Sequence, residues 1–215
     1  MKKQRFWGCK PPRKHEKEAD NDLHDDEDED ESDSTDDWED STDGNRIYLY
    51  DEIGRKVANR LSRQLRKASA SLLCAQSKYD GLVEIPIQLY INSYGGSLYD
   101  SFAIADMIKA SKVPVHTVIE GVACSGATII SMAGAKRFMR QHSSMLIHQL
   151  SSWAIGTYEN MKDDKENADM EMNMIYQFYE SHCSISRKEL KEVLKHDLFF
   201  PAKKCLELGM VDEII

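Results

Sequence analysis

The sequence lacks the features of a membrane or secreted protein. It contains no stretch of about 18 apolar residues, the length that a membrane-spanning helix needs. The basic start, MKKQR, is not followed by the apolar run of roughly 7–15 residues that a secretory signal requires. The five cysteines form no CxxC pair and show no metal-ligand spacing, which favours free thiols in a reducing compartment. We therefore expect a cytoplasmic protein without a metal, a cofactor or a membrane partner.

Most of the chain also lacks net charge. Residues 45–215 carry 21 Lys/Arg against 20 Asp/Glu, whereas residues 1–44 carry 7 against 17. The charge of −9 on the whole chain therefore belongs to its first segment. A nearly neutral remainder argues against binding of nucleic acid by bulk charge.

The first 44 residues have too few aliphatic side chains to build a core. The run DDEDEDESDSTDDWEDSTD cannot bury enough apolar surface to offset the entropy of the chain. We expect residues 1–44 to form a disordered acidic tail, which acts as a spacer, a removable pro-segment or an arm for a basic partner. Residues 45–215 are long enough to form one folded domain.

Apolar patterning in residues 45–215 alternates between strand-like and helix-like stretches. Strands are predicted at residues 46–53, 85–93, 113–123, 143–149 and 210–215. Helices are predicted at residues 55–73, 97–110 and 125–135, within 159–182, and at 187–196 and 201–209. This alternation favours an α/β fold with a mostly parallel sheet, in which functional residues gather in loops after the strand ends. The dense apolar run at 85–93 is typical of a strand buried on both faces.

The longest predicted helix carries apolar side chains on two sides. One side has Met170, Met174 and Phe178, and the other has Met172, Ile175 and Tyr179. One side can cover its own domain, whereas the other needs a partner. We therefore expect a homo-oligomer, the alternative being a helix buried wholly within one subunit.

Two glycine-rich stretches and one histidine stand after predicted strands. In GVACSGATIISMAG, Ser125 either begins a tightly packed helix of small residues or is a nucleophile with nothing bulky around it. The N–H of Gly126 would lack an intrahelical acceptor, and Gly95 in YINSYGG could offer a second free N–H to an oxyanion. His148 leaves a strand end and can face a neighbouring loop. Other candidates for the histidine role are His116, His142, His182 and His196.

Four blocks of the sequence, in the same order, resemble the proteolytic subunit of the ATP-dependent Clp protease. The similarity covers Arg46–Ile215. The blocks are INSYGGSLYDSFAIADMI, GVACSGATIISMAGAKR, SSMLIHQ and FFPAKKCLELGMVDEII. The resemblance implies a ClpP/crotonase-like α/β fold of stacked ββα-type units, with a mostly parallel sheet and a protruding long helix. It also implies a serine endopeptidase in stacked homo-oligomeric rings, to which a Clp-type ATP-dependent unfoldase delivers peptides or unfolded proteins.

The resemblance also assigns roles to residues. It implies Ser125 as nucleophile, His148 as base, and the N–H groups of Gly95 and Gly126 as the oxyanion hole. The family uses a Ser–His–Asp triad, so the resemblance also implies an acid. In the family this acid stands some six residues before the aromatic residue that precedes the last helix. Counting back without gaps from Phe199 reaches Val193, which is not an acid. We favour Asp197, with Glu192 or the loss of the acid as alternatives.

Other activities of related folds remain open. Signal-peptide peptidases use Ser with Lys, which the histidine in MLIHQ argues against. Acyl-CoA hydratases need no serine nucleophile, which the block around Ser125 argues against. A ring subunit without catalytic activity and a phage or viral capsid-maturation protease are the remaining alternatives.

Overall fold

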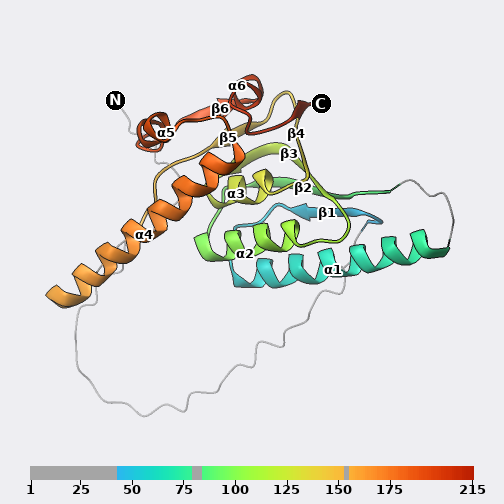
Figure 1. Cartoon of the computed structure of the whole chain (residues 1–215), viewed down its shortest axis with the longest axis horizontal. Coiled ribbons are helices and arrows are strands. Elements are labelled where there is room, and N and C mark those ends of the chain that lie inside the picture. Colours follow the sequence, from blue (N-terminus) through green and yellow to red (C-terminus); the bar gives the residue numbers. More distant parts are fainter. Residues whose placement is uncertain (1–42, 79–83, 153–154) are drawn as a thin grey trace, which may run out of the picture. The chain divides into compact units, whose positions relative to one another are not determined.

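The computed structural model describes residues 43–78, 84–152 and 155–215 (Figure 1). The chain divides into two units, Met1–Ser34 and Thr35–Ile215, and every described element belongs to the second. The expected disordered tail lies outside the described residues, except for Asp43 and Gly44. The fold below is therefore that of the second unit.

A seven-stranded sheet forms the centre of this unit. Its main path runs through β1 (Arg46–Leu49), β2 (Ile87–Ser93), β3 (Val115–Cys124), β4 (Lys136–Met139) and β7 (Glu213–Ile214). Every neighbouring pair on this path is parallel. β5 (Ser144–Leu146) runs parallel to the end of β3, and β6 (Phe199–Pro201) pairs antiparallel with β5. The expected α/β class with a mostly parallel sheet is confirmed.

Six helices within the described residues connect and cover these strands. They are α1 (Arg55–Lys78), α2 (Leu98–Lys109), α3 (Gly126–Met132), α4 (Tyr158–His182), α5 (Arg187–Val193) and α6 (Ala202–Glu207). In Figure 1, α1 and α2 lie side by side along the β1–β2 part of the sheet, and α3 contacts α2. A serine precedes α2 and α5, and a threonine precedes α4. Each of these side chains accepts a hydrogen bond from a backbone N–H in the first turn, which begins the helix there. Among the described helices, none is long and apolar enough to cross a bilayer.

The sheet is fully covered on one face only. Along β2, Ile87, Leu89 and Ile91 are buried, whereas Gln88 and Tyr90 are half-buried. The expectation that this strand is buried on both faces is therefore wrong. The covered face carries the main core, because the helices pack there.

Two strands were not predicted from the sequence. β4 has the sequence KRFM, and it pairs with β3, which precedes it across α3, and with β7 from the far end of the sequence. β6 is three residues long and ends in Pro201, which cannot donate to a ladder. The helix predicted at 125–135 ends at Met132, which leaves room for β4 to begin at Lys136.

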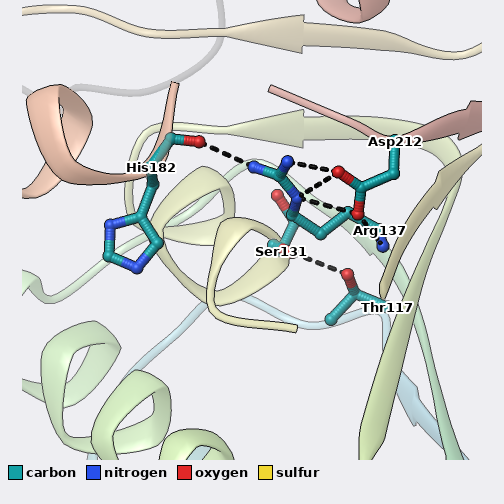
Figure 2. A network of polar contacts seen from close by, with 5 residues as sticks. All are labelled: Thr117, Ser131, Arg137, His182 and Asp212. Atoms are coloured by element: carbon teal, nitrogen blue, oxygen red, sulfur yellow. Dashed lines mark hydrogen bonds and ion pairs between the residues drawn. The ribbon is translucent and has the colours of Figure 1, made fainter. Parts of the chain in front are cut away.

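Arg137 joins three remote parts of this unit (Figure 2). Its side chain forms an ion pair with Asp212, next to β7, and Nη1 donates to the carbonyl of His182 at 2.7 Å. The Arg137 backbone N–H also donates to Asp212 Oδ2 at 2.8 Å. These bonds connect β4 to β7 and to the end of α4.

The Arg137–Asp212 pair predicts a loss of stability in acid. Hydrogen bonds from the Arg137 side chain hold the pKa of Asp212 below its usual 3.8. The stabilisation is therefore fully present above about pH 4 and is lost as the pH falls through the lower folded-state pKa. We expect Asp212→Asn to lower the free energy of unfolding at pH 7 by at most about 1 kcal/mol, since the pair is partly exposed. The variant should also lose less stability than the wild type between pH 7 and pH 3.

Urea unfolding at both pH values measures this difference. Asp169→Asn is the matched control, because Asp169 pairs with Lys165 on the exposed face of α4. Equal acid losses in the wild type and in Asp212→Asn would contradict the role given to this pair.

Candidate active site

Ser125 lies in the tight turn between β3 and α3. Its backbone has φ 52° and ψ −125°, and it is the one non-glycine residue with positive φ in the described part of the chain. Such a conformation costs about 1–3 kcal/mol and persists only where the surrounding structure enforces it. A strained strand-to-helix turn is also how α/β-hydrolases expose a serine Oγ. The Ser125 hydroxyl makes no capping hydrogen bond, so it is free for other partners.

Backbone hydrogen bonds hold this turn from both sides. The N–H of Ser125 donates to the carbonyl of Leu146 on β5 at 2.8 Å. The carbonyl of Ser125 accepts from the N–H of Thr128 at 3.0 Å and from its hydroxyl at 2.6 Å. Both peptide groups of the serine are therefore fixed.

The neighbouring thiol does not compete for the nucleophile's role. Cys124 is buried, as expected of a small apolar residue beside the site. Burial raises the pKa of the Cys124 thiol to about 11. The thiol is therefore protonated, and a poor nucleophile, at neutral pH.

The loop after β2 lies directly against the serine. Gly95 has φ +96°, and a Cβ atom there would lie 2.5 Å from the carbonyl oxygen of Cys124 and 2.8 Å from Ser125 Cβ. A Cβ atom on Gly126 would lie 2.2 Å from Ser101 Oγ on α2. The small residues around Ser125 are thus required by the close approach of three chain segments.

This close approach makes Gly95→Ala a severe variant. A methyl group at Gly95 must displace the Ser125 turn, and a misplacement of about 1 Å can cost roughly 100-fold in rate. We expect kcat/KM for peptide hydrolysis to fall by about that factor. Gly54→Ala is the control, because a Cβ atom there meets nothing within 4 Å and φ is not positive. Equal activities of the two variants would contradict this packing argument.

The two glycine amides after β2 differ in their partners. The N–H of Gly95 donates to Ser93 Oγ at 3.2 Å, so it is not a free donor in this structure. Ile53 forms a bridge to the same loop. Its N–H donates to the carbonyl of Gly95, and its carbonyl accepts from the N–H of Ser97, at 2.8 Å each. In this parallel bridge the N–H of Gly96 is turned to the opposite side, away from Ile53.

His148 follows the strand next to the serine. β5 runs parallel to β3 with Leu146 opposite Cys124, so Ser125 and His148 both follow the carboxyl ends of adjacent strands. His148 is half-buried. The other four candidate histidines lie elsewhere: one on the sheet beside Phe138, one at the end of α4 and two in exposed positions. They are, in that order, His116, His182, His142 and His196.

The two candidate acids differ in their surroundings. β5 and β6 pair antiparallel with Leu146 opposite Phe199, so His148 and Asp197 each lie two residues beyond the same end of this ladder. Glu192 lies on α5 with its carboxylate 2.8 Å from Lys195 Nζ, and this hydrogen bond lowers the pKa of Glu192. Glu192 is thus already paired, whereas Asp197 lies in an exposed irregular segment before β6.

The structure places Ser125 and His148 after adjacent strands and Asp197 before β6, without joining their side chains. Among the residues that it describes, no hydrogen bond or ion pair links the side chains of Ser125, His148 and Asp197. Catalytic hydrogen bonds in unliganded enzymes are often long and tighten only when substrate binds. The described residues also contain no group of three or more His, Cys, Asp or Glu that could hold a metal ion.

Comparisons with known proteins find a matching family and a similar fold. A family model described as Clp protease matches residues 29–215. The ATP-dependent Clp protease proteolytic subunit of Deinococcus radiodurans is 29% identical over 171 residues, which are 79% of this chain and 79% of that protein. The ATP-dependent Clp protease proteolytic subunit 1 of Rhodopirellula baltica is 31% identical over 131 residues, 60% of this chain and 58% of that protein. In structure, a mutant of ClpP1 from Listeria monocytogenes matches 80% of this chain and 92% of its own, with a TM-score of 0.69 and 23% identity.

Proposed function

The chain belongs to the Clp protease family, and from this premise we propose that it is a serine endopeptidase with Ser125 as its nucleophile. The observation that carries the proposal is the strained Ser125 turn, which has the Gly95 loop against it and the strand leading to His148 beside it. A strained backbone conformation costs free energy, and a residue that only fills space in the core would not need one.

The proposed reaction follows the serine-peptidase scheme. His148 takes the hydroxyl proton of Ser125, and Oγ adds to the carbonyl carbon of the peptide bond. When the tetrahedral intermediate collapses, His148 gives that proton to the leaving amine, and an ester to Ser125 remains. A water molecule, deprotonated by the same histidine, then hydrolyses the ester and releases the second product. Asp197 orients the imidazole and stabilises its protonated form.

Two backbone amides are proposed to hold the oxyanion. Gly126 N–H stands at the start of α3, where it has no intrahelical acceptor. The expected second donor, Gly95 N–H, must first give up its bond to Ser93 Oγ. The N–H of Gly96 faces away from Ile53 and is an alternative donor from the same loop. A preorganised donor of this kind is worth about 10²–10³ in kcat.

The long helix supports the proposal of a homo-oligomer. Its buried residues, Ile175 and Tyr179, lie in its second half, whereas the half that begins at Tyr158 is exposed. Apolar side chains stand on this exposed half, including Met161 and Tyr158, at 46% and 67% exposure. We propose that they contact other copies of the chain in stacked rings, which an ATP-dependent unfoldase of the Clp type supplies with unfolded protein. The expected cytoplasmic location stays a prediction.

Enclosure in rings predicts which substrates are cut. We expect the purified chain to hydrolyse short peptides without ATP, and folded proteins only together with an unfoldase, because a chamber admits only extended chains. Sedimentation of the same sample should show an assembly. A species that remains monomeric at micromolar concentration would contradict the ring proposal, and peptides that stay intact in an assembled sample would contradict the peptidase proposal.

A catalytically weak ring subunit is the second candidate. The observation that favours it is the lack of hydrogen bonds among the Ser125, His148 and Asp197 side chains within the described chain. It predicts the same assembly with little or no peptide hydrolysis, so the experiment above separates the two candidates.

A further inference from the structure

A buried tyrosine of α4 reaches the proposed nucleophile through one threonine. Tyr179 and Thr128 are 2% and 0% exposed, and their hydroxyl oxygens lie 2.6 Å apart. Thr128 Oγ1 also lies 2.6 Å from the carbonyl oxygen of Ser125. Because a carbonyl only accepts, the single hydroxyl proton of Thr128 points to Ser125. The Tyr179 hydroxyl must then donate to Thr128, which fixes the direction of both bonds.

The carbonyl at the end of this chain belongs to a peptide unit on which the reaction depends. The Ser125 C=O and the Gly126 N–H share one planar trans peptide, so they point in opposite directions. Any bond that holds the carbonyl therefore also sets the direction of the N–H. The strained φ of 52° at Ser125 persists only under such restraints, and the Thr128 hydroxyl adds one to the bond that the Thr128 N–H makes to the same carbonyl.

We propose that Tyr179 is a positioning residue for the peptidase reaction. Its hydroxyl holds Thr128 against the Ser125 carbonyl and so aims the Gly126 N–H at the oxyanion. The inference rests on the proposed function, since it requires Ser125 to be the nucleophile. The ring of Tyr179 fills space in the core, as a phenylalanine would, so the hydroxyl can be removed with little change in packing.

The test compares kcat, KM and the binding of a transition-state analogue in variants of the full chain. A peptide boronic acid is suitable, because its tetrahedral adduct places an oxygen where the oxyanion forms. Loss of an oxyanion donor costs about 10²–10³ in kcat, and a misaimed donor costs less. We expect Tyr179→Phe and Thr128→Val to lower kcat about tenfold, with KM within about twofold, and to weaken boronic acid binding by the same factor.

Thr117→Val is the matched control. Thr117 is also buried, and its hydroxyl donates at 2.6 Å to the carbonyl of Ser131 in the same helix, α3 (Figure 2). This variant removes an equivalent hydrogen bond that does not reach Ser125. We expect it to lower the free energy of unfolding and to leave kcat and boronic acid binding unchanged. If Tyr179 had a purely structural role, the Tyr179→Phe variant would behave in the same way.

Two further variants complete the test. Thr128→Ser keeps the hydroxyl and should restore most of kcat, and the double variant Tyr179→Phe/Thr128→Val should be no slower than Thr128→Val alone. An active wild type whose Tyr179→Phe variant keeps normal kcat and boronic acid binding overturns this inference alone. A wild type that cleaves no peptide overturns the proposed function and this inference with it. If Tyr179→Phe does not fold, equal kcat values for Thr128→Val and Thr128→Ser overturn the inference.

Discussion

Replacement of Ser125 by alanine is expected to lower kcat/KM for peptide hydrolysis by about 10⁴–10⁶, the range found when a serine protease loses its nucleophile. The neighbouring thiol cannot take over the reaction. The adjacent Cys124 is buried, and burial raises the pKa of its thiol to about 11. The rate that remains would come from substrate binding and the oxyanion donors alone.

Folding and assembly should survive this change. The Ser125 hydroxyl makes no capping hydrogen bond, so its removal leaves no buried partner unpaired. The positive φ disfavours any residue with a Cβ atom, and alanine keeps the same Cβ as serine. Sedimentation and thermal unfolding of the variant should therefore match the wild type. Substantial peptidase activity in a correctly assembled Ser125→Ala sample would show that another residue is the nucleophile.

The second large effect concerns the acid behind the histidine. Asp197→Asn is expected to lower kcat by about 10⁴, because an amide would favour the wrong tautomer of His148. Glu192→Gln serves as the matched carboxylate control, since Glu192 already accepts a hydrogen bond from Lys195 on the surface. It should keep a nearly normal rate.

The two variants together also test the choice between the acids. A loss of about 10³ or more in Glu192→Gln, with a near-normal rate in Asp197→Asn, would show that Glu192 fills the role. Near-normal rates in both variants would show that the triad lacks an acid from this chain.

The main features of the fold and the site follow from local sequence. Strands and helices have different periods of apolar residues, so the sequence shows that the two kinds of element alternate. This alternation predicts the parallel sheet. Glycines and small side chains around Ser125 predict a close approach of chain segments, and the structure has one at Gly95 and Gly126. The apolar run before His148 predicts that this residue leaves a strand end, and β5 ends two residues before it.

Features that depend on pairing between remote segments were not predicted. β4 carries two charged residues in four, and only its neighbours β3 and β7 make it a strand. His148 and Asp197 lie beyond the same end of the β5–β6 ladder because these two strands pair antiparallel, which no local pattern shows. The contact between Thr128 and Tyr179 joins residues 51 positions apart in the chain, and a buried hydroxyl pair has no signature in sequence.

Labelling with a fluorophosphonate probe, followed by peptide mapping, tests the central claim most directly. The probe reacts with a serine only when a base activates it, so it separates an enzyme from a ring subunit without activity. The account predicts one adduct, on Ser125, in the assembled wild-type chain, and no adduct in the His148→Ala variant. An assembled chain without an adduct on Ser125, or equal labelling of Ser125 in His148→Ala, would contradict it.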